Sequence, residues 1–408
     1  MKKIKLLTLL MAAPMLWSCS ADDPMPPQTE TPAVEDPNFI PLDEAIENAD
    51  KHFADFFGDN TRSGREVENV EFLGMRTRSD SNDDAHGFYV VNYENNGGFA
   101  LLSADRRRES VYAIAEEGTL HLSDTLSNKG LGWYINTILE GPDGIAAINP
   151  GIIPPIKPPV NPIDTGMHEP VFPTEKTWVT TIAVPMLKGF YSRFHQENPY
   201  NKYCPLKNEM RTMVGCVPLA VGTIIGYNEW PNVIDGYSLP WNDMRVKMYS
   251  DGWCRLFEIL GRKAYLNVKY GNQQTDGSAY YVEPTFKKLG YVGLKNSDFN
   301  EGYIDSELKN GMPVLAYSTA GGHHIWIIDG AKEKTTITTY PYDPNYISYK
   351  ETKYYHCVWG ENGWANGYFI YGSNESLGGA PVEYDGDSFG DMPVYKNIDI
   401  FYGYRPNR

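Results

Sequence analysis

Residues 213–231 read Met-Val-Gly-Cys-Val-Pro-Leu-Ala-Val-Gly-Thr-Ile-Ile-Gly-Tyr-Asn-Glu-Trp-Pro, a glycine and a cysteine followed by apolar and small residues. The run predicts a helix over residues 217–230 that stops at Pro231, because proline lacks the N–H that a helix interior needs. Cys216 therefore stands at a helix N-terminus, where the helix dipole and unpaired N–H groups stabilise a thiolate. A lone cysteine in this position is more often a buried structural residue, so the signal is weak by itself.

A second stretch, Gly321-Gly-His-His-Ile-Trp-Ile-Ile-Asp-Gly330, places two adjacent histidines at the start of a predicted strand over 325–329. A neutral imidazole can take the proton of a cysteine thiol or form a thiolate–imidazolium pair. The residues alone leave His323 and His324 both open as that partner. Gln196 precedes Cys216 and carries an amide that can donate to an oxyanion, although a single glutamine is usually a surface residue.

The rest of the C-terminal half predicts helices first and strands afterwards, which is an α+β pattern. The predicted helices cover 252–262 and 282–289, and the predicted strands cover 314–317, 325–329, 335–340, 354–359, 367–371 and 398–404.

The N-terminal half predicts a smaller α+β module. Residues 42–57 have helical apolar spacing with two acidic residues in the first turn. Residues 87–93 and 99–103 read as a hairpin around the Asn-Asn-Gly-Gly turn, and 111–115 reads as a third strand. Eight prolines in the 25 positions of 149–173 then predict an exposed, semi-rigid spacer that proteases can reach.

The first eighteen residues resemble an export signal rather than a structural element. Three lysines precede an apolar stretch, 6–17, that is too short to span a bilayer. The stretch ends in Leu16-Trp-Ser-Cys19, which resembles the lipobox of bacterial lipoproteins, so Cys19 is the predicted lipidation site; an ordinary cleaved signal peptide is the alternative. We therefore expect a lipid-anchored exported protein, and Asp22-Asp23 suggests display at the outer surface. The predicted domains are 1–18 signal peptide, 19–38 tether, 39–145 N-terminal module, 146–173 linker and 174–408 C-terminal domain.

Composition excludes some classes of function. The net charge of −16, from 36 basic and 52 acidic residues, argues against nucleic acid as a partner, because phosphate binding needs a basic face. The chain lacks a Cys-x-x-Cys pair, so a zinc knuckle is not expected. We also expect no other metal site and no cofactor. Export permits disulfides, and the sequence leaves their pairing open among Cys204, Cys216, Cys254 and Cys357.

The order of these motifs resembles the streptopain-like cysteine peptidases of the papain clan, peptidase family C10. The segment Gln196-Glu-Asn-Pro-Tyr-Asn-Lys-Tyr-Cys-Pro205 matches the family's Gln-x-x-Pro-Tyr-Asn-x-x-Cys-Pro, and the glycine, cysteine and valine at 215–217 match its Gly-Cys-Val helix start. The family's catalytic histidine precedes an Ile-Asp-Gly, and counting back from Asp329 selects His324. The resemblance covers about residues 180–408 and implies a papain-like domain with a helical part and an antiparallel sheet.

The resemblance also implies roles. Cys216 would be the nucleophile and His324 the general base and acid, while Gln196 would hold the oxyanion and Trp359 would wall the cleft. The N-terminal module resembles the family's propeptide, so it would cover the cleft as an intramolecular inhibitor until removed. The implied partners are protein or peptide substrates, the chain's own propeptide and, through the lipid anchor alone, a membrane.

Two departures from the family lie in the Trp loop, which here reads His356-Cys-Val-Trp-Gly-Glu-Asn-Gly363. Val358 stands where the family has the asparagine that orients the histidine, and Glu361 stands where it has a second tryptophan. The sequence therefore predicts a cysteine endopeptidase zymogen in which another group orients His324. The alternatives are a weakened homologue that binds peptides or a peptidase, and a transferase or amidase with the same dyad.

Overall fold

The computed structural model describes residues 38–58, 65–74, 87–106, 108–126, 128–140, 173–318, 323–340, 343–377, 380–381 and 398–408. The predicted signal peptide, Cys19 and the linker up to residue 172 lie outside these ranges. Pro37–Arg408 forms one compact unit. Within the described ranges, every helix is too short or too polar to cross a membrane.

The N-terminal part of this unit is a helix and a four-stranded antiparallel sheet, followed by a second helix. In helix α1, Leu42–Phe57, the apolar positions of the sequence pattern form the buried face. The chain then forms β1 Val67–Gly74, β2 Gly87–Tyr93, β3 Phe99–Ser103 and β4 Val111–Ala115, the short 3-10 helix η2 Leu122–Leu126, and α2 Lys129–Glu140.

The helical part of the C-terminal half is built around α3, Cys216–Asn228, whose residues 217–226 are all buried. A helix that is apolar all round must be enclosed by other elements, and α5, Asp251–Gly261, packs against it. The remaining elements of this part are η3 Gly189–Arg193, β6 Leu206–Lys207, β7 Met210–Arg211, β8 Val233–Ile234, β9 Tyr237–Ser238, α4 Trp241–Met244, η4 Ala279–Tyr281, α6 Val282–Lys288 and β10 Tyr291–Val292.

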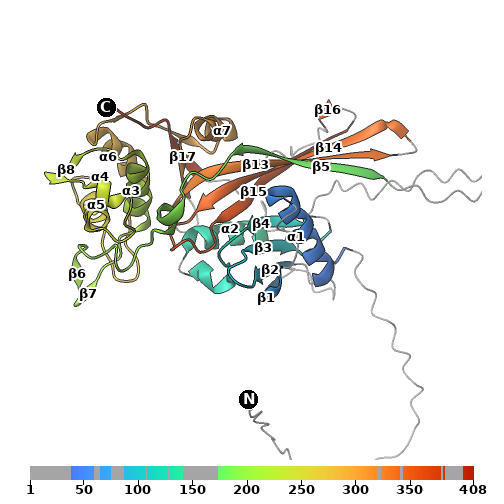
Figure 1. Cartoon of the computed structure of the whole chain (residues 1–408), viewed down its shortest axis with the longest axis horizontal. Helices are drawn as coiled ribbons and strands as arrows, with labels where there is room; N and C mark the ends of the chain where they lie inside the picture. Colours follow the sequence, from blue (N-terminus) through green and yellow to red (C-terminus); the bar gives the residue numbers. More distant parts are fainter. Residues whose placement is uncertain are drawn as a thin grey trace, which may run out of the picture. The chain divides into compact units, whose positions relative to one another are not determined.

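The strands of both halves join in one twelve-stranded sheet (Figure 1). Its C-terminal strands are β11 Lys295–Asp298, β12 Val314–Ser318, β13 Ile325–Tyr340, β14 Asp343–Val358, β15 Gly367–Leu377 and β17 Ile398–Tyr402, with β5 Thr174–Ala183 on β13, and β16 Ala380–Pro381 on β15. Helix α7, Glu301–Lys309, contacts β5, β12, β13 and β17, and β18, Arg405–Pro406, pairs with β10. The order β1-β2-β3-β4-β15-β14-β13-β12-β17-β11 makes β4 the neighbour of β15.

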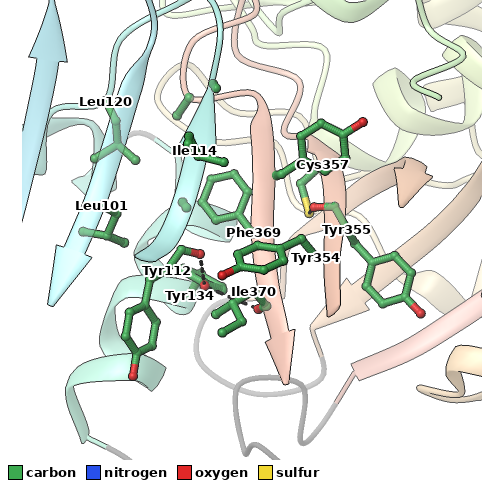
Figure 2. Packing of buried hydrophobic residues seen from close by; sticks show 14 of the residues in the cluster. Leu101, Tyr112, Ile114, Leu120, Tyr134, Tyr354, Tyr355, Cys357, Phe369 and Ile370 are labelled. Atoms are coloured by element: carbon green, nitrogen blue, oxygen red, sulfur yellow. Dashed lines mark hydrogen bonds between the residues drawn. The ribbon is translucent and has the colours of Figure 1, made fainter. Parts of the chain in front are cut away.

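The junction between the two halves is a shared hydrophobic core as well as a shared sheet. Ile114 and Ala113 of β4 pair with Tyr368 and Phe369 of β15. Figure 2 shows Tyr134 of α2 beside Phe369, with ring centroids 5.0 Å apart in an edge-to-face contact. The Tyr134 hydroxyl donates to the carbonyl oxygens of Tyr112 at 3.0 Å and Ile370 at 3.4 Å, so α2 is hydrogen-bonded to both halves.

The predicted α+β class is confirmed, and the predicted helices and strands are found with ends shifted by a few residues at most, except in the three long strands β13, β14 and β15. The strands predicted at 325–329 and 335–340 are one strand, β13, because the polar residues between them continue the ladder with β14 and β5. Likewise, β14 begins well before residue 354, and the strand predicted from 367 extends to Leu377. The sequence prediction did not include β1, β5, α2 or α7.

Candidate active site

Cys216 is the first residue of α3, and the segment before it is held from two sides. Gly215 adopts a φ of 93°, and a side chain there would have its Cβ 2.9 Å from Thr275 Cγ2. Thr275 Oγ1 in turn donates to the Met213 carbonyl at 2.7 Å. Val214 N donates to the Gln196 carbonyl at 2.9 Å. The fold therefore brings the backbone of Gln196 beside the residues that lead into Cys216.

The Cys216 thiol is partly enclosed, and several groups influence its charge. Burial raises its pKa above the ordinary value, and the nearby Glu361 carboxylate raises it further. Hydrogen bonds from the backbone of Ile325, Val217 and Cys216 itself lower the pKa, because N–H groups stabilise a thiolate. Since burial is the largest effect, the thiol is protonated at neutral pH in this structure. The contact with Ile325 places Cys216 beside the residue that follows His324.

A pocket lies where α3 meets the first residues of β13 and the end of β14. Cys216, Val358 and Trp359 all line it. The full lining is Tyr191, Phe194, Cys216, Leu219, Ala220, Thr223, Ile325, Trp326, Ile327, Val358, Trp359 and Gly360. Val358 pairs with Ile327 across the β13–β14 ladder, so it packs into the apolar core on the α3 side.

His324 is buried, with 3% of its surface exposed, and its imidazole is held by the Trp loop. Its Nε2 atom lies 3.2 Å from the Trp359 carbonyl oxygen. A backbone carbonyl therefore contacts the imidazole in a chain that has Val358 instead of asparagine. Burial, together with the positive charge of Lys129, lowers the pKa of His324 to about 4, although the hydrogen bond with the Trp359 carbonyl opposes the shift. Among the described residues, His324 and Cys216 share no hydrogen bond, so the predicted dyad is not engaged in this structure.

Helix α2 of the N-terminal part lies directly on this histidine. A Cβ on Gly130 would be 2.5 Å from His324 Cδ2 and 2.8 Å from Trp359 Cε3, so the two rings fill the space that a side chain would need and pack against the glycine itself. The neighbouring Lys129 donates from its ammonium group to Gln274 Oε1 of the C-terminal half. Sequence reasoning did not identify Gly130 or Lys129, although the buried Leu131, Tyr134, Ile135 and Ile138 of α2 have helical spacing.

The side chain of Gln196 contacts the Trp loop. Its Nε2 donates to Glu361 Oε1 at 3.0 Å. Two further hydrogen bonds join the same segments: the backbone Asn362 N donates to the Phe194 carbonyl at 3.3 Å, and the side-chain Asn366 Nδ2 donates to the Ser192 carbonyl at 2.8 Å. The predicted oxyanion residue and the altered position of the Trp loop are therefore partners, a contact that the sequence did not reveal.

Asp329 of the Ile-Asp-Gly motif lies in β13 and binds the backbone of residues 186–187, which precede η3. It is fully buried and accepts hydrogen bonds from Met186 N at 3.0 Å, Leu187 N at 2.8 Å and His356 Nδ1 at 2.6 Å. A buried carboxylate needs such partners, because leaving it without them costs several kcal/mol (about 3–5 when a partner of a buried pair is removed). This motif therefore has a clear structural role close to the site.

His323, the other candidate base, lies apart from these contacts. It is exposed, has a φ of 51°, and its Nδ1 is 3.1 Å from the Tyr317 hydroxyl. No disulfide joins any of Cys204, Cys216, Cys254 and Cys357. In the described ranges, no cluster of three or more His, Cys, Asp or Glu side chains is arranged to hold a metal ion.

Comparisons with known families match both halves of the chain. The family model described as Spi protease inhibitor matches residues 37–136, and the model of the Peptidase C10 family matches residues 194–257 and 264–369. The search of curated proteins gave no match.

Two solved structures from Prevotella intermedia are also similar to the chain. A fragment of prointerpain A is 16% identical with a TM-score of 0.47, and the match covers 83% of this chain and 100% of that one. Active wild-type interpain A cysteine protease is 18% identical with a TM-score of 0.36, covering 54% of this chain and 94% of that one.

The family models carry the conclusion. The C10 match includes Gln196, Cys216, His324 and Trp359, and the Spi match includes Gly130 and most of α2. The chain belongs to the Peptidase C10 family of cysteine peptidases and carries an N-terminal propeptide domain similar to the Spi protease inhibitor.

Proposed function

We propose that this cysteine peptidase zymogen hydrolyses peptide bonds in proteins, with Cys216 as nucleophile and His324 as general base and acid. One observation carries the proposal. Cys216 begins α3 and, at the same pocket, meets both Trp359 and the residues that directly follow His324. Helix dipole, backbone N–H groups and a neighbouring histidine are the components that activate a cysteine.

The chemistry divides into two steps. His324 takes the Cys216 proton, and the thiolate attacks the peptide carbonyl while the Cys216 N–H and the Gln196 amide stabilise the oxyanion. The C–N bond breaks as His324 returns the proton to the leaving amine, which leaves a thioester. Water then attacks the thioester, giving its proton to His324, and the acid product leaves as the Cys216 thiol re-forms. Trp359 shields the histidine from solvent, and its carbonyl oxygen orients the ring in place of the missing asparagine.

The N-terminal domain keeps this dyad silent by burying it. Gly130 of α2 packs against the His324 ring, and burial there lowers the imidazole pKa to about 4 while the Cys216 pKa is raised. Both shifts favour the neutral pair, which is a poor nucleophile. Removal of α2 re-exposes His324, and its pKa rises toward the ordinary value near 6.5.

The proposal also covers where the protein is located and how it is processed. Lipidation at Cys19 anchors the chain to a membrane after export, with display at the outer surface. Cleavage in the proline-rich linker, followed by loss of the N-terminal domain, then separates the catalytic part from that anchor. The support is the lipobox resemblance and the composition of residues 146–173.

One alternative has a specific observation in its favour. Val358 removes the asparagine of the family pattern, and His324 is not hydrogen-bonded to Cys216 in this structure. A weakened or inactive homologue that binds peptides or a peptidase would share both features.

Covalent labelling decides between the two functions. The full chain is allowed to mature and is then treated with an epoxide inhibitor of thiol peptidases, and casein cleavage is measured in parallel. We expect one adduct on Cys216, and a loss of at least about 10³-fold in cleavage rate in Cys216→Ala, because nucleophile and base act as a unit. Cys254→Ala is the matched control, since that cysteine is buried against the Pro199 carbonyl. Absence of both adduct and cleavage after removal of the N-terminal domain would support the binding protein.

A further inference from the structure

The contact between Gln196 and Glu361 is one that the proposed mechanism does not yet use. Gln196 Nε2 donates to Glu361 Oε1 at 3.0 Å, and the loop that carries Glu361 is bonded to the Gln196 segment through Asn362 N and the Phe194 carbonyl. Glu361 is partly buried, and in the described part of the chain no lysine, arginine or histidine forms an ion pair with it. A carboxyl group thus sits, without a counter-charge, beside the amide assigned to the oxyanion.

We infer that Glu361 is a positioning residue that holds the Gln196 amide for the oxyanion and makes the peptidase sensitive to the charge of its own carboxyl group. The inference rests on the proposed function of Cys216 and Gln196. It concerns a residue that stands where related sequences are expected to carry a tryptophan.

The geometry explains the positioning. A glutamine amide has two N–H groups. One donates to Glu361, which fixes the rotation of the amide, and the other remains for the oxygen that becomes negative when Cys216 attacks. Precise orientation matters because a donor that is already in place costs no reorganisation during the reaction.

The hydrogen bond of Glu361 favours catalysis, whereas the negative charge of its ionised carboxylate opposes it. An ionised carboxylate near Cys216 disfavours both the thiolate and the oxyanion, and the Cys216 pKa is indeed raised by Glu361. A protonated carboxyl still accepts the Gln196 hydrogen bond through its carbonyl oxygen, without the repulsion. The neutral form is therefore the productive one.

The groups around Glu361 bring the pKa of its carboxyl group into a pH range in which the enzyme can be assayed. Burial raises the pKa of Glu361 to about 7, and the Gln196 hydrogen bond opposes that rise. In the uncleaved chain the charged groups facing it are Glu197, the residue after Gln196, and Asp124 from η2 of the N-terminal domain, and both contribute to the raised pKa. Glu197 remains when that domain is removed, so we expect the activity of the matured enzyme to be high below the pKa of Glu361 and to fall as the pH rises through it.

The test compares the matured full chain with Glu361→Gln and Glu361→Leu, measuring kcat and KM on a fluorogenic peptide from pH 5 to 9. In parallel, the rate of Cys216 alkylation by iodoacetamide is measured on the same proteins. Glutamine mimics the protonated carboxyl, so we expect activity above pH 8 to exceed wild type by about three- to tenfold and the limb near pH 7 to disappear. Leucine cannot accept the hydrogen bond, so kcat falls by roughly tenfold or more at every pH with little change in KM.

The control and the contrary outcomes separate this inference from the proposed function. Glu283→Gln removes a surface carboxylate that pairs with Lys287 on α6, and it should reproduce the wild-type profiles. Identical pH profiles for wild type and Glu361→Gln would overturn the inference and leave the function standing. If wild type shows no Cys216-dependent cleavage, the proposed function fails, and the alkylation profiles decide the inference alone: identical profiles overturn it.

Discussion

A single glycine determines how closely the N-terminal domain approaches the proposed catalytic histidine. The backbone of Gly130 packs against both His324 and Trp359, and any side chain there would overlap one of the two rings. A glycine in a helix costs about 1 kcal/mol relative to alanine. Close approach to the histidine is therefore the physical reason for glycine at this position.

Replacing this glycine should loosen the inhibited state. We expect Gly130→Ala to move α2 away from His324, so that the uncleaved chain gains measurable Cys216-dependent activity and unfolds at a lower temperature. The new Cβ would be 2.5 Å from His324 Cδ2, closer than such contacts allow, and overpacking of this kind costs about 1–3 kcal/mol. Peptide cleavage and thermal unfolding of chains that are kept intact would measure both effects.

A matched substitution controls for helix propensity. Gly302→Ala makes the same change in α7, where the nearest atom to a new Cβ is Asn300 Oδ1 at 3.3 Å. It should leave the uncleaved chain silent. If Gly130→Ala were equally silent and equally stable, Gly130 would not be what holds α2 against His324.

At the residue scale, the sequence could indicate candidate catalytic residues but not their contacts with residues that are distant in the sequence. Cys216 could be proposed as the nucleophile from the predicted helix start together with the order of the motifs around it, which resembles the family. Gln196 and Glu361 are far apart in the sequence, so their hydrogen bond depends on how the Trp loop folds back. The burial of His324 against Gly130 depends on α2, a helix from the other half of the chain, and no local pattern contains that information.

At the scale of elements, apolar periodicity was most successful in predicting helices and strands that bury only one of their faces. Helix α1 shows the 3.6-residue period clearly, and all five of its buried residues follow it. Helix α2 was missed because Gly130 and Gly132 lower helix propensity, although its apolar residues are correctly spaced. Strand β5 was missed because it is largely exposed and rich in threonine, so it lacks an apolar pattern. Its hydrogen bonds to β13, rather than burial of side chains, hold it in the sheet.

The packing of α1 on the sheet includes a buried histidine that should make docking sensitive to acid. His52 lies between Lys334 Nζ, 3.2 Å from its Nδ1, and the Tyr354 hydroxyl, 3.2 Å from its Nε2. An ammonium group can only donate, so Nδ1 accepts and the ring is neutral. Burial, and then the charges of Lys334 and Lys350, hold the His52 pKa well below its usual range, while Asp55 pairs with Lys334.

The sign of the pH dependence follows from that depressed pKa. The unfolded histidine binds a proton near pH 6.5 and the folded one does not, so the contribution to stability is present above pH 6.5 and is lost as the pH falls below it. We expect wild type to lose about 1–2 kcal/mol more stability than His52→Phe between pH 7 and pH 5. Denaturant unfolding of the full chain at both pH values would measure this.

Comparing the stability that wild type and His52→Phe lose in acid separates the effect of His52 from that of the other titrating groups. His324 and His195 are also shifted downward by burial, so both proteins should lose some stability in acid. Phenylalanine can keep the ring contact with Phe56 while removing the titrating nitrogen atoms. Equal losses in the two proteins would show that His52 does not couple acid to the packing of α1.

At the scale of the whole molecule, the two halves recognised by separate family models share one sheet and one core. The pairing of β4 with β15 makes the N-terminal strands a continuation of the peptidase sheet. The buried cluster that includes Tyr134, Trp326 and Phe369 likewise draws residues from both halves. The sequence predicts a boundary between the halves at the proline-rich linker, but the shared sheet depends on pairings between distant strands, which have no local signal.

This continuity predicts that cleavage of the linker alone does not release the propeptide. The cut should fall before residue 174, because Thr174–Ala183 is paired with β13 as strand β5 and is protected there. The N-terminal fragment should then stay bound through the β4–β15 pairing and the buried rings around Tyr134, so the nicked protein remains inactive until that fragment is degraded. Size-exclusion chromatography and mass spectrometry of the nicked protein would find both fragments in one peak, and Tyr134→Ala, which costs about 3–5 kcal/mol in this core, should allow them to separate. Immediate full activity on nicking, with the fragments already apart, would contradict the prediction and place the barrier to activation in the linker instead.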